Sequence, residues 1–222
     1  MSLQNYSLVE LFEILIIPAM FETFYMMIIA ATLAIFIGGA VGTILFLTDN
    51  QGLTPNKSAF AVIDTIVNIV RSFPFTILVI SIIPLTRGLV GTSIGSTAAI
   101  VPLTISSASF MARTFQNSLN EVDDSLIEAG RAFGLTVPQI VTKIVYIEAV
   151  PSLISGISLG IITLLSQTAA AGAVGAGGLG ATALTYGYQS FNYRVMYSVV
   201  ILLIVIVAVI QLVANMLYKK AK

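Results

Sequence analysis

The chain of 222 residues contains no cysteine and no histidine, and only 9 % of its residues are charged. Without cysteine, disulfides, thiolate nucleophiles, zinc thiolates and iron–sulfur clusters are excluded. Without histidine, the commonest metal ligand and general base is missing, so most enzyme chemistry is disfavoured. Ten basic and ten acidic residues give a formal charge of zero, so the composition does not favour a nucleic-acid partner.

Nucleotide-binding motifs are also missing. No glycine is followed by lysine, which excludes a P-loop and ATP hydrolysis by that route. A GxGxxG match occurs at Gly175, Gly177 and Gly180, but a dinucleotide site needs a preceding strand and a later acidic residue. Here a predicted membrane helix precedes the match, and no acidic residue follows Glu148. The glycine-rich stretch 172–180 instead predicts irregular backbone at membrane depth, which is tolerated where protein or water covers it.

Apolar residues make up 57 % of the chain, and they occur in long uncharged stretches such as those between Glu22 and Asp49 and between Glu148 and Arg194. A helix needs about 20 mostly apolar residues to cross a bilayer core about 30 Å thick. We therefore predict an all-α polytopic membrane protein with a transmembrane domain over residues 18–218. Its five predicted spans are about 19–47, 66–85, 94–112, 151–171 and 195–218.

The ends of the chain predict its orientation. Residues 1–17 contain acidic but no basic residues, so they are expected to form an amphipathic external lead-in rather than a cleavable signal peptide. The basic tail 219–222 is predicted to stay in the cytoplasm, and five spans then place the amino terminus outside. In this topology seven basic residues lie inside and two, Arg87 and Arg194, lie outside.

Polar and small residues within the spans predict either a translocation path or close helix packing. Polar side chains inside a membrane face protein or a water-filled cavity, and small residues four apart allow helices to cross closely. Arg71 either extends to the inner interface or faces such a path, and Asp64, seven residues earlier, lies on the same helix face. Residues of the third and fourth spans either line a translocation path or pack helices together. They are Thr104, Ser107, Ser109, Ser152, Gly156, Gly160, Thr163 and Gln167.

The predicted cytoplasmic loop 113–149 is large for a connector, and its pattern is helical. Gly134 is well placed to end a first helix, and Pro138 to open a second. A short helix with apolar and small residues outside the membrane favours docking in the groove of a partner. The alternative is a self-packed amphipathic hairpin on the membrane surface.

The run Glu128-Ala129-Gly130, followed by Gly134 and Ile144, resembles the EAA loop of importer-type ABC permeases. Gly130 stands where that family often has alanine, and Ile147 where it usually has proline. The resemblance implies a coupling helix that docks on an ATPase subunit. The residues that it assigns to this contact are Glu128, Ala129, Gly130, Arg131, Phe133, Gly134 and Ile144.

The resemblance extends over about residues 60–215 and favours the permease subunits of methionine ABC importers. The stretches that carry it are 68–74, 90–95, 99–104, 171–180 and 186–188. It implies a homodimer, two cytoplasmic ATPase subunits that hold ATP and magnesium, an external methionine-binding protein, and a place in the bacterial inner membrane. It also implies that the chain itself is not an enzyme and binds no cofactor. Five spans are few to enclose a path, which independently favours a dimer.

Other functions remain open on the sequence. Another amino acid or an osmolyte could be the substrate, because no residue can be identified that recognises a thioether. An ion-coupled secondary transporter would normally contain an intramembrane acidic or histidine relay, and Asp64 is the single candidate. A membrane enzyme is disfavoured by the lack of clustered intramembrane carboxylates, cysteine and histidine.

Overall fold

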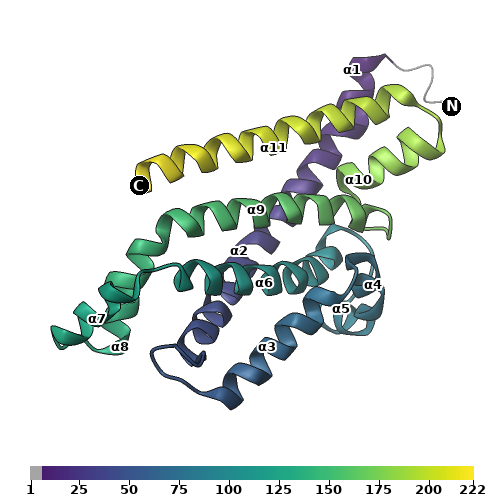
Figure 1. Cartoon of the computed structure of the whole chain (residues 1–222). Coiled ribbons are helices and arrows are strands. Elements are labelled where there is room, and N and C mark those ends of the chain that lie inside the picture. The colour runs from purple at the N-terminus through teal and green to yellow at the C-terminus, as the bar shows by residue number, and fades with distance from the viewer. Residues whose placement is uncertain (1–6) are drawn as a thin grey trace. The chain divides into compact units, whose positions relative to one another are not determined.

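The computed structural model describes residues 7–222, and the regular elements that it contains there are all helical (Figure 1). Residues 1–6 of the predicted lead-in lie outside the described residues. The elements are α1 (Leu8–Leu11), η2 (Phe12–Ile16), α2 (Ile17–Thr48), α3 (Lys57–Ser72), α4 (Phe75–Ser81), α5 (Ile83–Val90), α6 (Ser96–Asn120), α7 (Asp124–Ala132), α8 (Val137–Ile140), η3 (Val141–Val145), α9 (Tyr146–Gly172), α10 (Gly178–Thr182), η4 (Ala183–Gln189) and α11 (Tyr193–Ala221). The three η elements are π-helical, and the predicted all-α class is confirmed.

Four continuous helical stretches are long and apolar enough to cross a bilayer. They are Val9–Thr48, Ser96–Asn120, Val137–Gly172 and Tyr193–Ala221. A fifth crossing is present if α3 and α4 count as one bent span, which agrees with the five spans predicted. The expected lead-in is not set apart in the described residues, because α1, η2 and α2 follow one another without a break.

The segment predicted as a single span over 66–85 is divided into α3, α4 and α5. Pro74 stands at the N-cap of α4, and proline disfavours the helical conformation in the residue before it. A second break falls at Ile82, where α5 begins with a proline in its first turn. Hydropathy alone predicts an apolar segment here, whereas the proline positions determine how the segment is divided.

The chain forms two compact units, each of which is described by itself. Unit 1 comprises Met1–Leu33, Phe73–Ser107 and Ile161–Ile210, and unit 2 comprises Ala34–Ser72, Ala108–Gly160 and Gln211–Lys222. Unit 2 has a main apolar core, hereafter the unit 2 core. Its buried residues are Ala34, Phe46, Ala108, Met111, Phe115, Leu119, Val122, Ile127, Ile140, Val145, Ala149 and Leu153.

Glycines let two helices of unit 2 approach closely. A Cβ on Gly38 of α2 would overlap the Met111 side chain and lie 2.8 Å from the Ala108 carbonyl oxygen of α6. A Cβ on Gly42, one turn later, would overlap the carbonyl oxygen of Ala112. Because lipid provides no hydrophobic drive for helices to associate, such close backbone packing is what holds α2 against α6.

Candidate functional site

Helix α7 lies in unit 2, within the loop 113–149 that contains the resemblance to the EAA loop, hereafter the coupling segment. Its first turn is capped by Asp123. The carboxylate of Asp123 accepts a hydrogen bond from the backbone N–H of Ser125 at 2.8 Å. Hydrogen bonds from Ser125, from its side chain and its amide, lower the pKa of Asp123 because they favour the charged carboxylate. The cap fixes where α7 begins.

The other end of α7 is closed by Gly134, as the sequence predicts. Gly134 has φ = +76°, a left-handed conformation that glycine adopts without strain. The N–H of Gly134 donates to the Arg131 carbonyl at 2.9 Å, and that of Leu135 donates to the Gly130 carbonyl at 3.1 Å. These bonds satisfy the last carbonyls of the helix, and α8 then begins with Pro138 in its first turn.

The inner face of α7 packs on the chain itself. Ile127 is buried in the unit 2 core, together with Ile140 of α8. Gly130 is buried too, and a Cβ there would lie 2.7 Å from the Ile144 Cδ1 atom and 3.4 Å from Ile140 Cγ1. Two residues that the resemblance assigns to the ATPase contact, Gly130 and the half-buried Ile144, therefore face each other inside unit 2.

The exposed residues of α7 and of the turn that ends it are hereafter called its outer face, and two of them, Glu128 and Arg131, also border a cavity within unit 2. Glu128, Ala129, Arg131 and Gly134 are exposed, and Phe133 exposes 85 % of its side chain. The side chains of Glu128 and Arg131 make no hydrogen bond or ion pair with another residue of the range 7–222. A large apolar side chain, Phe133, is therefore exposed at the end of α7 beside two charged residues.

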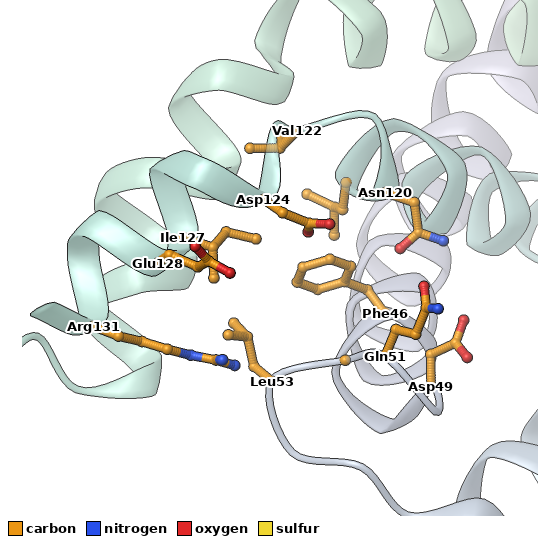
Figure 2. Close-up of a pocket in the computed structure, with 12 residues that line it drawn as sticks. Phe46, Asp49, Gln51, Leu53, Asn120, Val122, Asp124, Ile127, Glu128 and Arg131 are labelled. Atoms are coloured by element: carbon orange, nitrogen blue, oxygen red, sulfur yellow. The ribbon is translucent and has the colours of Figure 1, made fainter.

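A cavity of about 470 Å³ lies between α7 and the loop that follows α2, and of the residues that line it, Glu128 and Arg131 are the two that the sequence identifies as functional candidates. Figure 2 shows the side chain of Arg131 extending from α7 toward Leu53, and Asp124 and Glu128 also line the cavity from α7. The remaining lining comes from the end of α2 and the loop after it, from the end of α6 and the connection after it, and from α7. It consists of Phe46, Asp49, Gln51, Gly52, Leu119, Asn120, Val122 and Ile127.

The loop beside this cavity folds back on the end of α2. The N–H of Thr54 donates to the Leu47 carbonyl at 2.9 Å, and that of Asn56 donates to the Thr48 carbonyl at 3.0 Å. Leu53 packs against the unit 2 core, which also contains Ile127 of α7, so the loop and α7 share one apolar core. The turn-forming residues Asp49 to Gly52 are the sequence signal that predicts a loop here, but they do not show what it touches.

In unit 2, residues proposed for a path lie where α9 crosses α6. The hydroxyl of Ser152 donates to the hydroxyl of Ser118 at 3.0 Å. A Cβ on Gly156 would overlap the Thr114 methyl group, and one on Gly160 would overlap the end of Met111. Ser109 on α6 is buried. Ser152, Gly156 and Gly160 therefore take part in the close packing of α9 against α6.

In unit 1, another part of α9 is joined to α6 by polar side chains. The Gln167 amide donates from Nε2 to the Ser106 hydroxyl at 3.0 Å and accepts from the Ser107 hydroxyl at 3.3 Å. Thr104 is buried and its hydroxyl oxygen has no hydrogen-bond partner in the described part of the chain. Thr163, on α9, is half-buried.

Arg71 and Asp64 do not form a pair. Arg71 is exposed on α3, whereas the Asp64 carboxylate bonds to Arg113 of α6 at 2.5 Å. Among residues 7–222, no group of three or more potential metal ligands comes together.

The glycine-rich stretch in unit 1 is held by hydrogen bonds to its backbone. The N–H of Gly178 donates to the Glu22 carboxylate at 2.6 Å, and that of Leu179 donates to the Thr23 hydroxyl at 2.9 Å. Gly175, Gly177 and Gly178 all have φ between +76° and +91°. The GxGxxG match is therefore part of an irregular turn in which the amides of Gly175, Ala176, Gly178 and Leu179 donate within the chain and are not free to hold a phosphate.

Comparisons with known proteins agree on one family. Residues 51–221 match the family described as binding-protein-dependent transport system inner membrane component. The chain is 40 % identical over 206 residues to the probable D-methionine transport system permease protein MetI of Vibrio cholerae, covering 93 % of this chain and 92 % of that protein. It is 41 % identical over 213 residues to the methionine import system permease protein MetP of Bacillus subtilis, covering 96 % and 94 %.

A solved structure gives the same result. An inward-facing structure of the MetNI methionine ABC transporter contains a chain that superposes with a TM-score of 0.91 and is 41 % identical. The match covers 94 % of this chain and 96 % of that one. The similarity thus extends over nearly the whole length of both chains.

Proposed function

Since the chain belongs to the family of binding-protein-dependent transport system inner membrane components, we propose that it is the permease subunit of an ATP-driven methionine importer. It is a multi-pass inner membrane protein. Relatives named for D-methionine transport and for methionine import, each similar along almost the whole chain, support methionine as the substrate. The amino terminus lies outside and the carboxyl terminus in the cytoplasm, following the distribution of basic residues.

The observation that carries this proposal is the exposed outer face of α7. A chain without a P-loop needs a separate motor, and α7 offers Phe133 together with the unpaired Glu128 and Arg131. Its inner face is already packed, so the exposed face is available to an ATPase. The complete importer comprises two copies of this chain, two ATPase subunits that hold ATP and magnesium, and an external binding protein. The permease itself has no catalytic role and no cofactor.

The packing within unit 2 suggests how force passes from the ATPase. Ile127 of α7, Leu119 of α6 and Ala149 of α9 belong to the same buried core. A displacement of α7 must therefore move the neighbouring ends of α6 and α9, because close-packed interiors transmit movement rather than absorb it. Alternating exposure of the substrate site to the two sides of the membrane follows from such a rocking motion.

The path across the membrane is proposed to follow the polar and small residues of α3, α6 and α9. These are Arg71, Thr104, Ser107, Ser109, Ser152, Gly156, Gly160, Thr163 and Gln167. Arg71 is exposed, whereas the other eight are buried or partly buried within the chain. Arg71 is therefore the first of these residues to test for an effect on the apparent affinity for substrate.

The direct test is to purify the chain together with its ATPase, reconstitute the complex in vesicles and measure methionine uptake. ATP-dependent uptake that is stimulated by the binding protein is the expected result. Uptake of a different amino acid or of an osmolyte would show that methionine is not the substrate, but the chain would still be the permease of an ATP-driven importer. Uptake driven by an ion gradient without any ATPase would contradict the proposed function altogether.

A further inference from the structure

Helix α3 is held in unit 2 by a small apolar contact. Val67 is the one residue of α3 that is fully buried, and it packs with Leu45 of α2 and Ala112 of α6. Two further residues of α3, Phe60 and Ile63, are partly buried at the margin of this cluster. Apolar packing of α3 in unit 2 therefore rests on a single buried side chain.

A polar network completes the attachment, and its centre is Arg113 of α6. The guanidinium donates from Nη2 to the Asp64 carboxylate at 2.5 Å and to the Asn68 amide oxygen at 2.9 Å, both on α3. It donates from Nη1 to Gln116 of its own helix at 2.7 Å. The Asn68 amide in turn donates to the second Asp64 oxygen at 2.9 Å. The bond between Arg113 and Asp64 is the one ion pair within residues 7–222.

The geometry of the network fixes how α3 lies against α6. Asp64 and Asn68 are one turn apart on the same face of α3. A guanidinium holds its donors in a rigid plane, so bonds to both residues define the rotation and the height of α3 relative to Arg113. The two charged side chains are 21 % and 27 % exposed. A buried or half-buried ion pair adds little stability over an apolar pair, whereas it does specify register.

The same stretch of α6 is joined to α7 by its opposite face. Phe115 follows Arg113 by two residues, which is a rotation of about 200° around the helix. Phe115 and Leu119 belong to the unit 2 core with Ile127 of α7. Helix α6 thus has α7 packed on one side through apolar contacts and α3 bonded on the other through Arg113.

We propose that Arg113 and Asp64 are positioning residues that make α3 move with α6 when the ATPase displaces α7. The inference rests on the proposed function, because it takes α7 to be the element that an ATPase moves. It adds a specific link: the polar network carries the movement across α6 to the exposed helix that contains Arg71. Without the network, α7 still responds to ATP, but α3 does not follow it.

The first test compares uptake with ATP hydrolysis in the reconstituted complex. Arg113→Gln and Asp64→Asn are each expected to lower methionine uptake about tenfold, a size typical of residues that transmit coupling, while hydrolysis changes less than about twofold. The exchange of charges, Asp64→Arg with Arg113→Asp, is expected to restore most of the uptake. Lys57→Gln is the matched control, since it removes an exposed charge from α3 outside the network and should behave as the wild type.

Two results of that test would overturn the proposal. One is wild-type uptake by Arg113→Gln. The other is an exchanged pair that is no better than the single variants, because then the two residues do not act together. If Arg113→Gln fails to assemble, the exchanged pair decides: recovered uptake supports the link, and absent uptake overturns it.

A second measurement does not depend on which solute is transported. The chain has no cysteine, so spin labels can be placed at Ser58 on α3 and Asn120 on α6 through two introduced cysteines. On trapping with ATP, the distance between the labels should stay constant in the wild type and should change in Arg113→Gln. A change in the wild type, or none in the variant, would overturn the link. If the wild-type complex hydrolyses ATP without importing methionine, methionine is not the substrate, but the label distance still tests the coupling of α3 to α6. If no ATPase binds, the proposed function and the proposed coupling both fail.

Discussion

Glycines form part of a sequence motif both in the stretch 172–180 of unit 1 and in helix α7 of unit 2. In the structure, the glycines of the two segments have different roles. In the first, glycines allow backbone to touch backbone, and the free amides are bonded to Glu22 and Thr23. In the second, a glycine packs against side chains of its own unit and leaves an exposed outer face. The stretch 172–180 is bonded and packed within its own unit, so its role is structural. Helix α7 is packed on one face and exposed on the other, so its exposed face can bind another protein.

The comparison predicts that replacing a glycine is most harmful in the stretch 172–180. A Cβ on Gly180 would overlap the backbone of Ala169, which cannot rotate away as a side chain can. Gly180→Ala is expected to lower the free energy of unfolding by about 2–3 kcal/mol, the upper part of the range found for overpacked sites. Thermal unfolding of the purified chain in detergent measures this.

Gly88→Ala is the matched control, because nothing lies within 4 Å of a Cβ there and Gly88 is within α5. It should be neutral or slightly stabilising, since alanine favours the helix. Equal stability of both variants would show that α9 and α10 do not approach as closely as described.

A smaller effect is expected from the carboxylate that bonds to the glycine-rich stretch. Glu22→Ala removes the acceptor for the Gly178 amide and should cost about 1 kcal/mol, a typical value for one hydrogen bond. Glu22→Gln keeps an acceptor oxygen and should cost less. Hydrogen exchange at the Gly178 amide follows the bond directly; unchanged protection in Glu22→Ala would contradict its role.

The smallest effect is expected at Gly130. Its Cβ would lie 2.7 Å from the Ile144 Cδ1 atom, which must shift but can do so at low cost because it is the far end of a flexible side chain. Alanine also favours a helix over glycine by up to about 1 kcal/mol, so Gly130→Ala should change the unfolding free energy by less than about 0.5 kcal/mol. A loss as large as that of Gly180→Ala would remove the distinction between the two segments.

The sequence predicts α7 well because its boundaries are determined locally. The left-handed glycine at 134 and the proline at 138 act within one turn of the chain, and both are recognisable as residue types. The long apolar helices are predicted for a similar reason, since length and hydropathy are sufficient. The break at Pro74 shows the limit, because a hydropathy window averages over a single residue that ends a helix.

Other features depend on contacts between distant residues and could not be predicted. Periodicity shows that Ser152 and Gly156 share a helix face, but it does not show that Ser118 and Thr114 cover them. The role of Leu53 likewise depends on a loop folding back onto the unit 2 core. The spacing of Asp64 and Arg71 places both on one face of α3, but it does not show that Asp64 bonds to Arg113, which lies 49 residues further along the chain on α6.

The central claim is that the outer face of α7 binds a separate ATPase, and the affinity of the ATPase for Phe133→Ala measures it most directly. Phe133 is 85 % exposed, so the variant should unfold at the wild-type temperature, as should the control Phe36→Ala, whose side chain is 74 % exposed on α2. We expect Phe133→Ala to bind the ATPase about tenfold or more weakly, as for a buried aromatic anchor, and Phe36→Ala to bind normally. Wild-type affinity and wild-type uptake in Phe133→Ala would contradict the account.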